Sequence, residues 1–495
     1  MKYFLLSFLF GCLIAYTQTD TPEVTYEDLN ATSCPIDAEA SAYYIYEKGS
    51  SFINLTTFEL VTNYQARIKI LNKNAFRVGN ITITLQKTKN GTENLSELTG
   101  KTYNLENNTI VSHTLDKEHV YIDDSNQYIK LVKFSLPNIK KGSIIEYHYT
   151  KKSPFVFNFK NWNFQDYIPK LYSQYDTKIP AIFQYRKKLL GYLDFETHTA
   201  EIESNCINQG KVKSDCAIET YAMKNIPAFK EESFMLSPEN YISQLEFELL
   251  STDWINGKKH YTKEWNDIDQ DLRFNYSLGK EAKSKANFKD AVTQEIKDLE
   301  YNLIKAKRIY YYLQNILLWN KKVDVFKAFD LKKTLEDKIG SSTELNMILL
   351  NTLKAYGFDA KIMLLSTRAN GKVTKLHPSI SEFNYMIVNL VIQGQTHLLD
   401  ISNKFKKFGD LPFKCYNHYG RVMDFKKGSY WQDIIPKNKL IRNSDIHFTI
   451  EDDLVKGHAR IKNEGFISSS KRAMYFKNKE KYLKYFENGG TIQLL

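Results

Sequence analysis

Cysteine is scarce in this sequence: its 495 residues include five, and none of them forms a Cys-x-x-Cys pair. The His-Glu-x-x-His pattern of zinc peptidases is also missing, and the ten histidines are scattered along the chain. Because the common spacings of metal ligands are missing, we expect no metal and no cofactor. Long tracts of proline, glycine or serine are lacking too, which argues against extensive disorder. At this length, the chain is expected to be multidomain.

Long apolar runs are missing beyond the N-terminus, so we expect no transmembrane helix in the mature chain. The N-terminus itself has Lys2, an apolar run over residues 3–14, and then Ala15-Tyr16-Thr17-Gln18. This layout predicts a signal peptide over residues 1–18 and a periplasmic or extracellular protein. Cys12 offers the alternative of a lipoprotein. Phe10 is bulky for a lipidation motif, however, and the apolar run continues beyond Cys12.

Acidic residues are fewer than basic ones, which gives a formal net charge of +11. The lysines are spread along the chain rather than clustered. We therefore expect a solvated basic surface, suited to anionic polymers of the cell envelope, and no nucleic-acid partner.

Two cysteines lie close together in the sequence. Cys206 and Cys216 flank the turn-forming residues Asn208-Gln209-Gly210. In an oxidising compartment, this spacing is compatible with a disulfide across a β-hairpin. Two unpaired thiols are the alternative, and the sequence leaves the choice open.

The region from about residue 40 to 250 has the period-two pattern of half-buried strands. Apolar residues alternate with polar ones, and turn clusters such as Lys89-Asn90-Gly91 separate the runs. We expect an all-β antiparallel sandwich over residues 19–250. The apolar positions of three such runs are Tyr64, Ala66, Ile68 and Ile70; Ile81, Ile83 and Leu85; and Ile145, Tyr147 and Tyr149.

The period changes to that of amphipathic helices after Gly279. Helices are expected within residues 281–318, and another follows Gly340, where Ser341 and Glu344 form a capping box and Gly357 suits the C-cap. Strands are expected over 360–366, 384–392 and 397–401. This is an α+β domain over residues 281–436. Residues 251–280 are predicted to connect the two domains, and a hairpin and a short basic helix are expected within a partial C-terminal β domain, residues 437–495.

Several spaced blocks occur in the α+β region: Trp319-Asn320, Ile339-Gly340-Ser341-Ser342-Thr343-Glu344-Leu345-Asn346, Leu364-Leu365-Ser366-Thr367-Arg368-Ala369-Asn370-Gly371, Phe383-Asn384-Tyr385 and Leu398-Leu399-Asp400. They resemble the transglutaminase-like (papain-like) core of secreted multidomain proteins of Bacteroidetes-type bacteria. In those proteins a β domain of unknown function comes first, and Arg67-Ile68-Lys69-Ile70-Leu71-Asn72, Gly142-Ser143-Ile144-Ile145-Glu146-Tyr147 and Trp162-Asn163-Phe164-Gln165 resemble it. A further β domain normally follows, and residues 437–495 resemble only its beginning.

The resemblance implies a catalytic triad of cysteine, histidine and an acidic residue for acyl transfer from an amide. By motif, these positions are Ser342, Tyr385 and Asp400, so only the acid is kept. A tyrosine, with a reference pKa of about 10, is a poor base for a serine hydroxyl. The resemblance therefore predicts a degenerate site whose groove binds a peptide, protein or peptidoglycan-like ligand at the envelope. The expected cleft residues are Trp319, Ser342, Glu344, Asn346, Tyr385 and Asp400.

Two alternatives stay open. The chain is an active amide-processing enzyme, acting on peptides or peptidoglycan, if Ser342 or an unrecognised residue is the nucleophile. The candidate bases are His377, in a loop, and His397, which is three residues before Asp400 and so on the opposite face of a regular strand. Alternatively, the chain is a truncated product whose unfinished C-terminal domain limits its stability.

Overall fold

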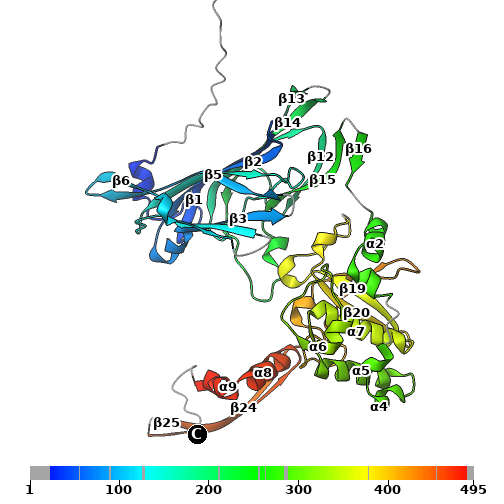
Figure 1. The fold of residues 1–495 in the computed structure, drawn as a ribbon. Helices are drawn as coiled ribbons and strands as arrows, with labels where there is room; N and C mark the ends of the chain where they lie inside the picture. The colour runs from blue at the N-terminus through cyan, green and yellow to red at the C-terminus, as the bar shows by residue number, and fades with distance from the viewer. Residues whose placement is uncertain are drawn as a thin grey trace, which may run out of the picture. The chain divides into compact units, whose positions relative to one another are not determined.

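The computed structural model describes residues 23–487, with gaps at 55, 89–90, 125–128, 210–211, 255–256, 262–263, 284–287, 377 and 453. The predicted signal peptide therefore lies outside the described residues. The chain is mostly β, with several sheets, and it divides into two compact units (Figure 1). The first comprises Met1–Lys230 and Ser243–Leu249, and the second comprises Glu231–Ile242 and Leu250–Leu495. Within the described ranges, no helix combines the length and apolar composition that a membrane span requires.

An eight-stranded sheet forms the framework of the first unit. In spatial order its strands are β13 (Thr197–Gln209), β14 (Val212–Ile226), β11 (Lys170–Pro180), β1 (Ala42–Asn54), β2 (Glu59–Ile70), β9 (Ile144–Ser153), β5 (Asn94–Glu106) and β6 (Thr109–Thr114). The pair β1–β11 is parallel, so the prediction of a wholly antiparallel sandwich is wrong at this pair. The period-two pattern reports which face a side chain occupies and carries no information on strand direction. A parallel pair also lacks the hairpin turn that marks antiparallel neighbours.

Two smaller sheets accompany the large one. The first has the order β4 (Gly91–Thr92), β3 (Asn80–Thr88), β8 (Ile129–Ser135) and β7 (Val120–Asp123); the second joins β10 (Trp162–Asn163), β15 (Gln244–Trp254) and β12 (Phe183–Leu190), with β16 (Gly257–His260) on β15. The predicted apolar positions Ala66 and Ile68 of the large sheet and Ile83 of β3 belong to one buried cluster. Burial of apolar side chains between the large sheet and the sheet that contains β3 thus stabilises the first unit.

The opposite face of β2 is also buried, which differs from the predicted half-buried strand. Lys69 is fully buried, and its Nζ donates to the carbonyl oxygens of Leu29 (2.6 Å) and Gly142 (2.7 Å). Leu29 belongs to the N-terminal helix α1 (Tyr26–Asn30). The sequence pattern did not show this burial because the covering groups come from distant parts of the chain. Burial lowers the pKa of Lys69 to about 8.

The hairpin of β13 and β14 contains a disulfide between Cys206 and Cys216, with Cα atoms 5.7 Å apart. The bond lies beside an irregularity in the ladder between Glu203 and Ile207. A covalent link there restricts the unfolded chain and so stabilises the folded hairpin.

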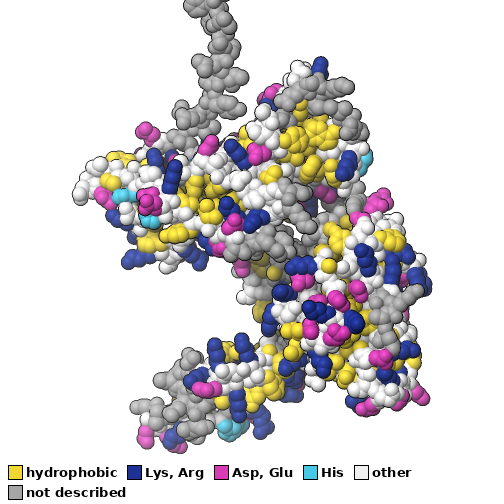
Figure 2. Space-filling model, in the orientation of Figure 1, with side chains coloured by type: hydrophobic (Ala, Val, Ile, Leu, Met, Phe, Trp, Pro, Cys, Tyr) yellow, Lys and Arg dark blue, Asp and Glu magenta, His cyan; other side chains and the backbone are white. Residues whose placement is uncertain are grey.

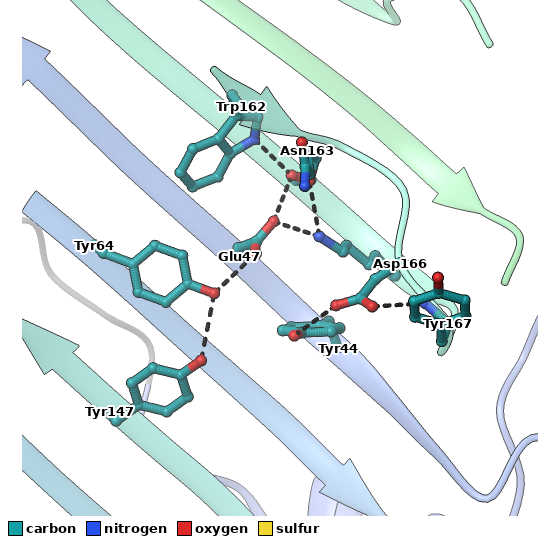
Figure 3. Close-up of polar contacts among 10 residues, drawn as sticks. Tyr44, Glu47, Tyr64, Tyr147, Trp162, Asn163, Asp166 and Tyr167 are labelled. Atoms are coloured by element: carbon teal, nitrogen blue, oxygen red, sulfur yellow. Dashed lines mark hydrogen bonds and ion pairs between the residues drawn. The ribbon is translucent and has the colours of Figure 1, made fainter. Parts of the chain in front are cut away.

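A buried polar network crosses the centre of the large sheet (Figure 3). Glu47 of β1 accepts hydrogen bonds from Lys170 Nζ (2.6 Å), Ser173 Oγ (3.0 Å) and Tyr64 OH (2.7 Å). Lys170 also donates to the carbonyl oxygen of Asn163 at 3.0 Å. Glu47 and Lys170 are 6% and 1% exposed, so this ion pair is almost completely removed from water. Such a pair is tolerated because each charge has several polar partners.

The second unit is an α+β arrangement around a five-stranded sheet in the order β21 (Gln395–Leu399), β20 (Tyr385–Ile392), β19 (Asp359–Leu365), β22 (Tyr419–Met423) and β23 (Tyr430–Asp433). Helix α7 (Ser342–Ala355) packs on β19 and β20 (Figure 1). Leu345 and Ile348 of α7 share a buried cluster with Met386 of β20. Tyr385 and Ile387 belong to a separate cluster. Alternate residues of β20 thus contribute to two clusters, as expected for opposite faces of a strand.

Residues 251–280, which we expected to connect the two domains, contain strand residues of β15 and β16 and most of two helices. Helices α2 (Trp265–Phe274) and α3 (Ser277–Glu281) contribute to the core of the second unit through Ile268, Leu272 and Leu278. Asp269 of α2 forms a buried two-hydrogen-bond ion pair with Arg421 of β22, at 2.9 and 2.6 Å. The helices are short and one buried position is an acid, so their apolar period is weak in the sequence.

The second unit contains further helices and strands beyond this framework. They are α4 (Gln294–Lys297), α5 (Leu303–Ile316), β17 (Leu318–Trp319), α6 (Leu331–Asp337) and β18 (Ile339–Gly340), followed by β24 (Ile441–Glu451), β25 (Leu454–Glu464), α8 (Phe466–Lys477) and α9 (Lys479–Glu487). β24 and β25 pair as a hairpin. The predicted hairpin is therefore present but longer, and the expected basic helix is the second of two helices.

The basic side chains are dispersed on the visible surface. On the face shown in Figure 2, Lys and Arg side chains are spread over both units and interspersed with Asp and Glu side chains.

Candidate functional site

The predicted site begins at the N-terminus of α7, where the capping box is formed as the sequence indicates. Ser341 Oγ accepts from Glu344 N, and Ser341 N donates to Glu344 Oε2 at 2.7 Å. Glu344 Oε1 accepts from Thr334 Oγ1 at 3.0 Å. Both oxygens of Glu344 thus stabilise the helix start. Gly340 precedes the box in close contact with Thr334, since a Cβ atom there would lie 2.7 Å from Thr334 Cγ2.

Ser342 is the first residue of α7 and is fully buried. Its backbone N–H donates to the carbonyl oxygen of Lys322 at 3.0 Å. Its hydroxyl oxygen has no hydrogen-bond partner among the described residues. A serine nucleophile needs a base within about 2.6–3.2 Å of its oxygen, or one water away, to remove the proton. The described part of the chain places no such base beside Ser342.

Asp400 lies just beyond β21 and is fully buried. Its Oδ2 accepts from Tyr385 OH at 2.9 Å, and its Oδ1 accepts from Asn346 Nδ2 at 3.2 Å and from Ser402 N at 2.8 Å. The carboxylate is therefore satisfied by three donors from three segments. It is held as part of the interior rather than presented to solvent.

Asn346 joins α7 to β20 and to the segment after β21. It follows Ser342 by four residues, so the two side chains lie on the same face of α7, one turn apart. Its amide donates to the carbonyl oxygen of Met386 at 3.0 Å, and its Oδ1 accepts from Ile401 N at 3.0 Å. The helix that begins with Ser342 is therefore tied to β20 and to Asp400, and Tyr385 contacts Asp400 directly.

Tyr385 occupies the position where a catalytic base is expected, but its hydroxyl donates a hydrogen bond to Asp400. Burial raises the pKa of Tyr385 well above its ordinary value, and the nearby Asp400 carboxylate raises it further. Its hydroxyl also lies 3.0 Å from Ser402 Oγ. A phenol has a single proton, and since that proton is donated to Asp400, Ser402 must be the donor to Tyr385. Tyr385 therefore has no capacity to accept a proton from Ser342.

The predicted binding cleft is not open at these residues, which corrects the expectation. Ser342, Asn346 and Asp400 are each 0% exposed and Tyr385 is 1% exposed. Trp319 is half-buried, and its Nε1 donates to the carbonyl oxygen of Lys322 at 2.6 Å. The sequence motif could not show that neighbouring side chains cover these residues.

Lys414 is one of the covering side chains, and sequence reasoning missed it. Its ammonium lies 4.1 Å from the centre of the Tyr385 ring and 5.0 Å from that of Trp319. Two cation–π contacts favour this position for the ammonium. Lys414 therefore spans the two aromatic side chains that the motif assigns to the cleft.

Two further interior groups near Asp400 were also missed. Cys415 is fully buried, and burial followed by the charge of Asp400 raises the pKa of its thiol well above the ordinary value. Ser402, two residues after Asp400, completes a local turn by donating its N–H back to the carboxylate. The second of these has a weak sequence signal, since an Asp side chain often accepts from the backbone N–H two residues later.

Of the two histidines considered as substitute bases, His397 lies among the described residues and His377 does not. The ring of His397, on β21, packs against Phe408 with centroids 5.2 Å apart, and burial lowers the pKa of His397. His377 lies outside the described residues. Within the described ranges, no cluster of three or more His, Cys, Asp or Glu side chains suited to a metal ion occurs.

Comparisons with known proteins give weak similarities. No family model matches the chain, and no curated protein matches it. Among solved structures, a candidate protease from Parabacteroides distasonis is similar over 73% of this chain and 70% of its own, with 14% identity and a TM-score of 0.48. A transglutaminase (TGase) is similar over 47% of this chain and 51% of its own, with 8% identity and a TM-score of 0.18. Both TM-scores are low, so the function of the site is inferred from the contacts of its residues and not from these similarities.

Proposed function

We propose that this chain is an exported, transglutaminase-like protein whose second unit no longer catalyses acyl transfer and acts in binding or assembly at the cell envelope. One observation carries the proposal: the buried hydroxyl of Ser342 has no hydrogen-bond partner among the described residues. Without a base, an alcohol is a poor nucleophile at neutral pH.

The hydrogen bonds around Asp400 support the same conclusion. In a working triad the acid orients a base, whereas here it accepts a hydrogen bond from Tyr385 OH and two more from Asn346 and Ser402 N. Nucleophile and base act together in catalysis, so replacing both removes the catalytic machinery rather than adjusting its rate. The positions that remain have become a buried polar network that fixes α7 against β20 and the segment after β21.

Export is supported by the N-terminal layout of residues 1–18 and by the disulfide of the first unit. Disulfides persist in oxidising compartments such as the periplasm. The expected ligand is a peptide, protein or peptidoglycan-like chain, and no nucleic-acid partner is proposed. Because four of the six expected cleft residues are buried, such a ligand would contact the accessible surface around Trp319 and Lys414 rather than Ser342 itself.

A search for products tests the proposal. The purified mature protein and its Ser342→Ala variant are incubated with a complex mixture of peptides and peptidoglycan fragments, and mass spectrometry is used to detect cleavage or cross-linking. We expect no product from either protein. A product that appears with the original chain and disappears with Ser342→Ala would show a serine-dependent amide-processing enzyme and would overturn the proposal.

A further inference from the structure

A cavity of about 630 Å³ in the second unit lies outside the candidate site. Its walls come from α5, from the start of α4, from the loop after Asp400 and from α8. Pockets of about 300–1,000 Å³ are typical of small-molecule sites. None of Ser342, Tyr385 or Asp400 lines this cavity, so its function is independent of the proposed one.

Cationic side chains outnumber carboxylates at the cavity. Arg308 of α5 and Lys404 of the loop line it, together with one carboxylate, Glu295. Both cations are exposed, and among the described residues neither forms an ion pair. Arg308 can therefore offer its planar set of N–H donors to a ligand, and this set fits a carboxylate in a two-bond arrangement.

Aromatic rings provide flat apolar surfaces in the same cavity. Tyr312 lies one turn of helix after Arg308, so both project from the same face of α5. Phe405 stacks on Phe476 of α8, with ring centroids 5.6 Å apart and planes 9° apart. A sugar ring presents an apolar face of C–H groups that packs on such rings. The exposed amide of Asn315 and the carboxylate of Glu295 supply donors and acceptors that match hydroxyl groups.

The loop that carries Lys404 and Phe405 is held in place before any ligand arrives. Gln314 Nε2 of α5 donates to the carbonyl oxygens of Asn403 (2.9 Å) and Lys406 (3.0 Å), on either side of the two residues. A third bond runs from Phe408 N to Tyr311 OH at 3.1 Å. Fixing binding groups in advance reduces the entropy that ligand binding costs. This cavity therefore has the properties of a built site rather than of a gap between mobile segments.

We propose that this cavity binds an acidic saccharide, with a sugar carboxylate held by Arg308 and Lys404 and a sugar ring packed on Tyr312 and Phe405. Two cations against one carboxylate favour an anionic ligand over a neutral one. The rings favour a saccharide over a simple inorganic anion, which has no apolar face.

Isothermal titration of the full mature chain with tri-galacturonate tests this proposal. The matched ligand is the same trisaccharide with its carboxylates reduced to neutral alcohols. We expect the acidic form to bind and the reduced form to bind about tenfold more weakly or worse, because charged hydrogen bonds are lost. Equal affinity for the two forms, or no binding of the acidic form, would overturn the proposal.

Matched variants separate a specific site from general attraction to a basic chain. Arg308→Gln is expected to weaken binding about ten- to a hundredfold. Lys307→Gln removes the same charge one residue earlier on α5, but Lys307 does not line the cavity, so it should leave the affinity almost unchanged. Tyr312→Ala should weaken binding of the saccharide with no change in charge. Equal losses for Arg308→Gln and Lys307→Gln would show non-specific electrostatics and contradict the proposal.

Discussion

The buried ion pair of Glu47 and Lys170 leads to a prediction that separates the energetic effect of burial from that of the distance between the charges. Lys170→Met keeps the length of the side chain and removes its charge. The Glu47 carboxylate then stays buried, with hydrogen bonds from Tyr64 and Ser173 but no opposite charge. Breaking a buried pair by removing one partner is destabilising because the remaining charge is left uncompensated.

The expected magnitude follows from the burial of the two groups. Lys170 is 1% exposed and Glu47 is 6% exposed, so water cannot screen the remaining charge. Removing one partner of a buried pair lowers the free energy of unfolding by about 3–5 kcal/mol. Because two hydroxyl groups still donate to Glu47, we expect about 3 kcal/mol here. For a unit of this size, that lowers the unfolding midpoint by roughly 6–12 °C. Glu47→Gln together with Lys170→Met should cost less than the sum of the two single changes, by about 2 kcal/mol.

Calorimetry of the full chain measures these shifts, and the same strand supplies a matched control. Lys178 of β11 pairs with Glu203 at the same 2.6 Å distance, but these side chains are 42% and 43% exposed. Lys178→Met should therefore change the free energy of unfolding by less than about 1 kcal/mol. Equal destabilisation by Lys170→Met and Lys178→Met would refute the reasoning, because it would show that burial of the pair has no energetic consequence.

Three further predictions concern the second unit and the free thiols. Glu344→Ala should destabilise the chain by about 1–2 kcal/mol in urea unfolding, because it removes the hydrogen bonds that Ser341 N and Thr334 Oγ1 donate to the Glu344 carboxylate at the start of α7; no change would show that this carboxylate contributes nothing. Cys34 and Cys415 are buried, and the pKa of Cys415 is raised by burial, so at about pH 8 iodoacetamide should modify neither thiol until the chain is unfolded; peptide mapping that finds rapid native alkylation would contradict this. Burial raises the pKa of Tyr310 and Tyr385 well above the ordinary value. Their contribution to stability is thus complete below about pH 10 and is lost as the pH rises further; tyrosinate absorbance should show these groups ionising only as circular dichroism reports alkaline unfolding, and ionisation in the folded chain would contradict this.

Local chemistry explains which parts of the fold could be predicted from the sequence. The start of α7 was predicted to the residue, because the Ser341–Glu344 box is a signal contained within four positions. Gly357 has a φ of 82°, which agrees with the predicted left-handed end of that helix. Strands β19, β20 and β21 begin and end within two residues of their expected bounds, since their apolar runs are interrupted by turn residues.

The features that sequence reasoning missed depend on partners far away in the chain. Lys69 is buried because carbonyl groups of Leu29 and Gly142 surround its ammonium. Helix α2 belongs to the core partly through the Asp269–Arg421 pair, which no apolar period can indicate. The closure of the expected cleft, including the position of Lys414, likewise follows from tertiary packing. Periodicity and short motifs contain no information on such contacts.

The central claim is that Ser342 is not an activated nucleophile. The most direct test is labelling of the mature protein with a fluorophosphonate probe, which reacts with serines whose proton a neighbouring base removes, followed by intact-mass and peptide analysis beside Ser342→Ala. We predict no probe on Ser342 and the same background for both proteins. Stoichiometric labelling of Ser342 that is lost in Ser342→Ala would contradict this account and show that a base reaches its hydroxyl.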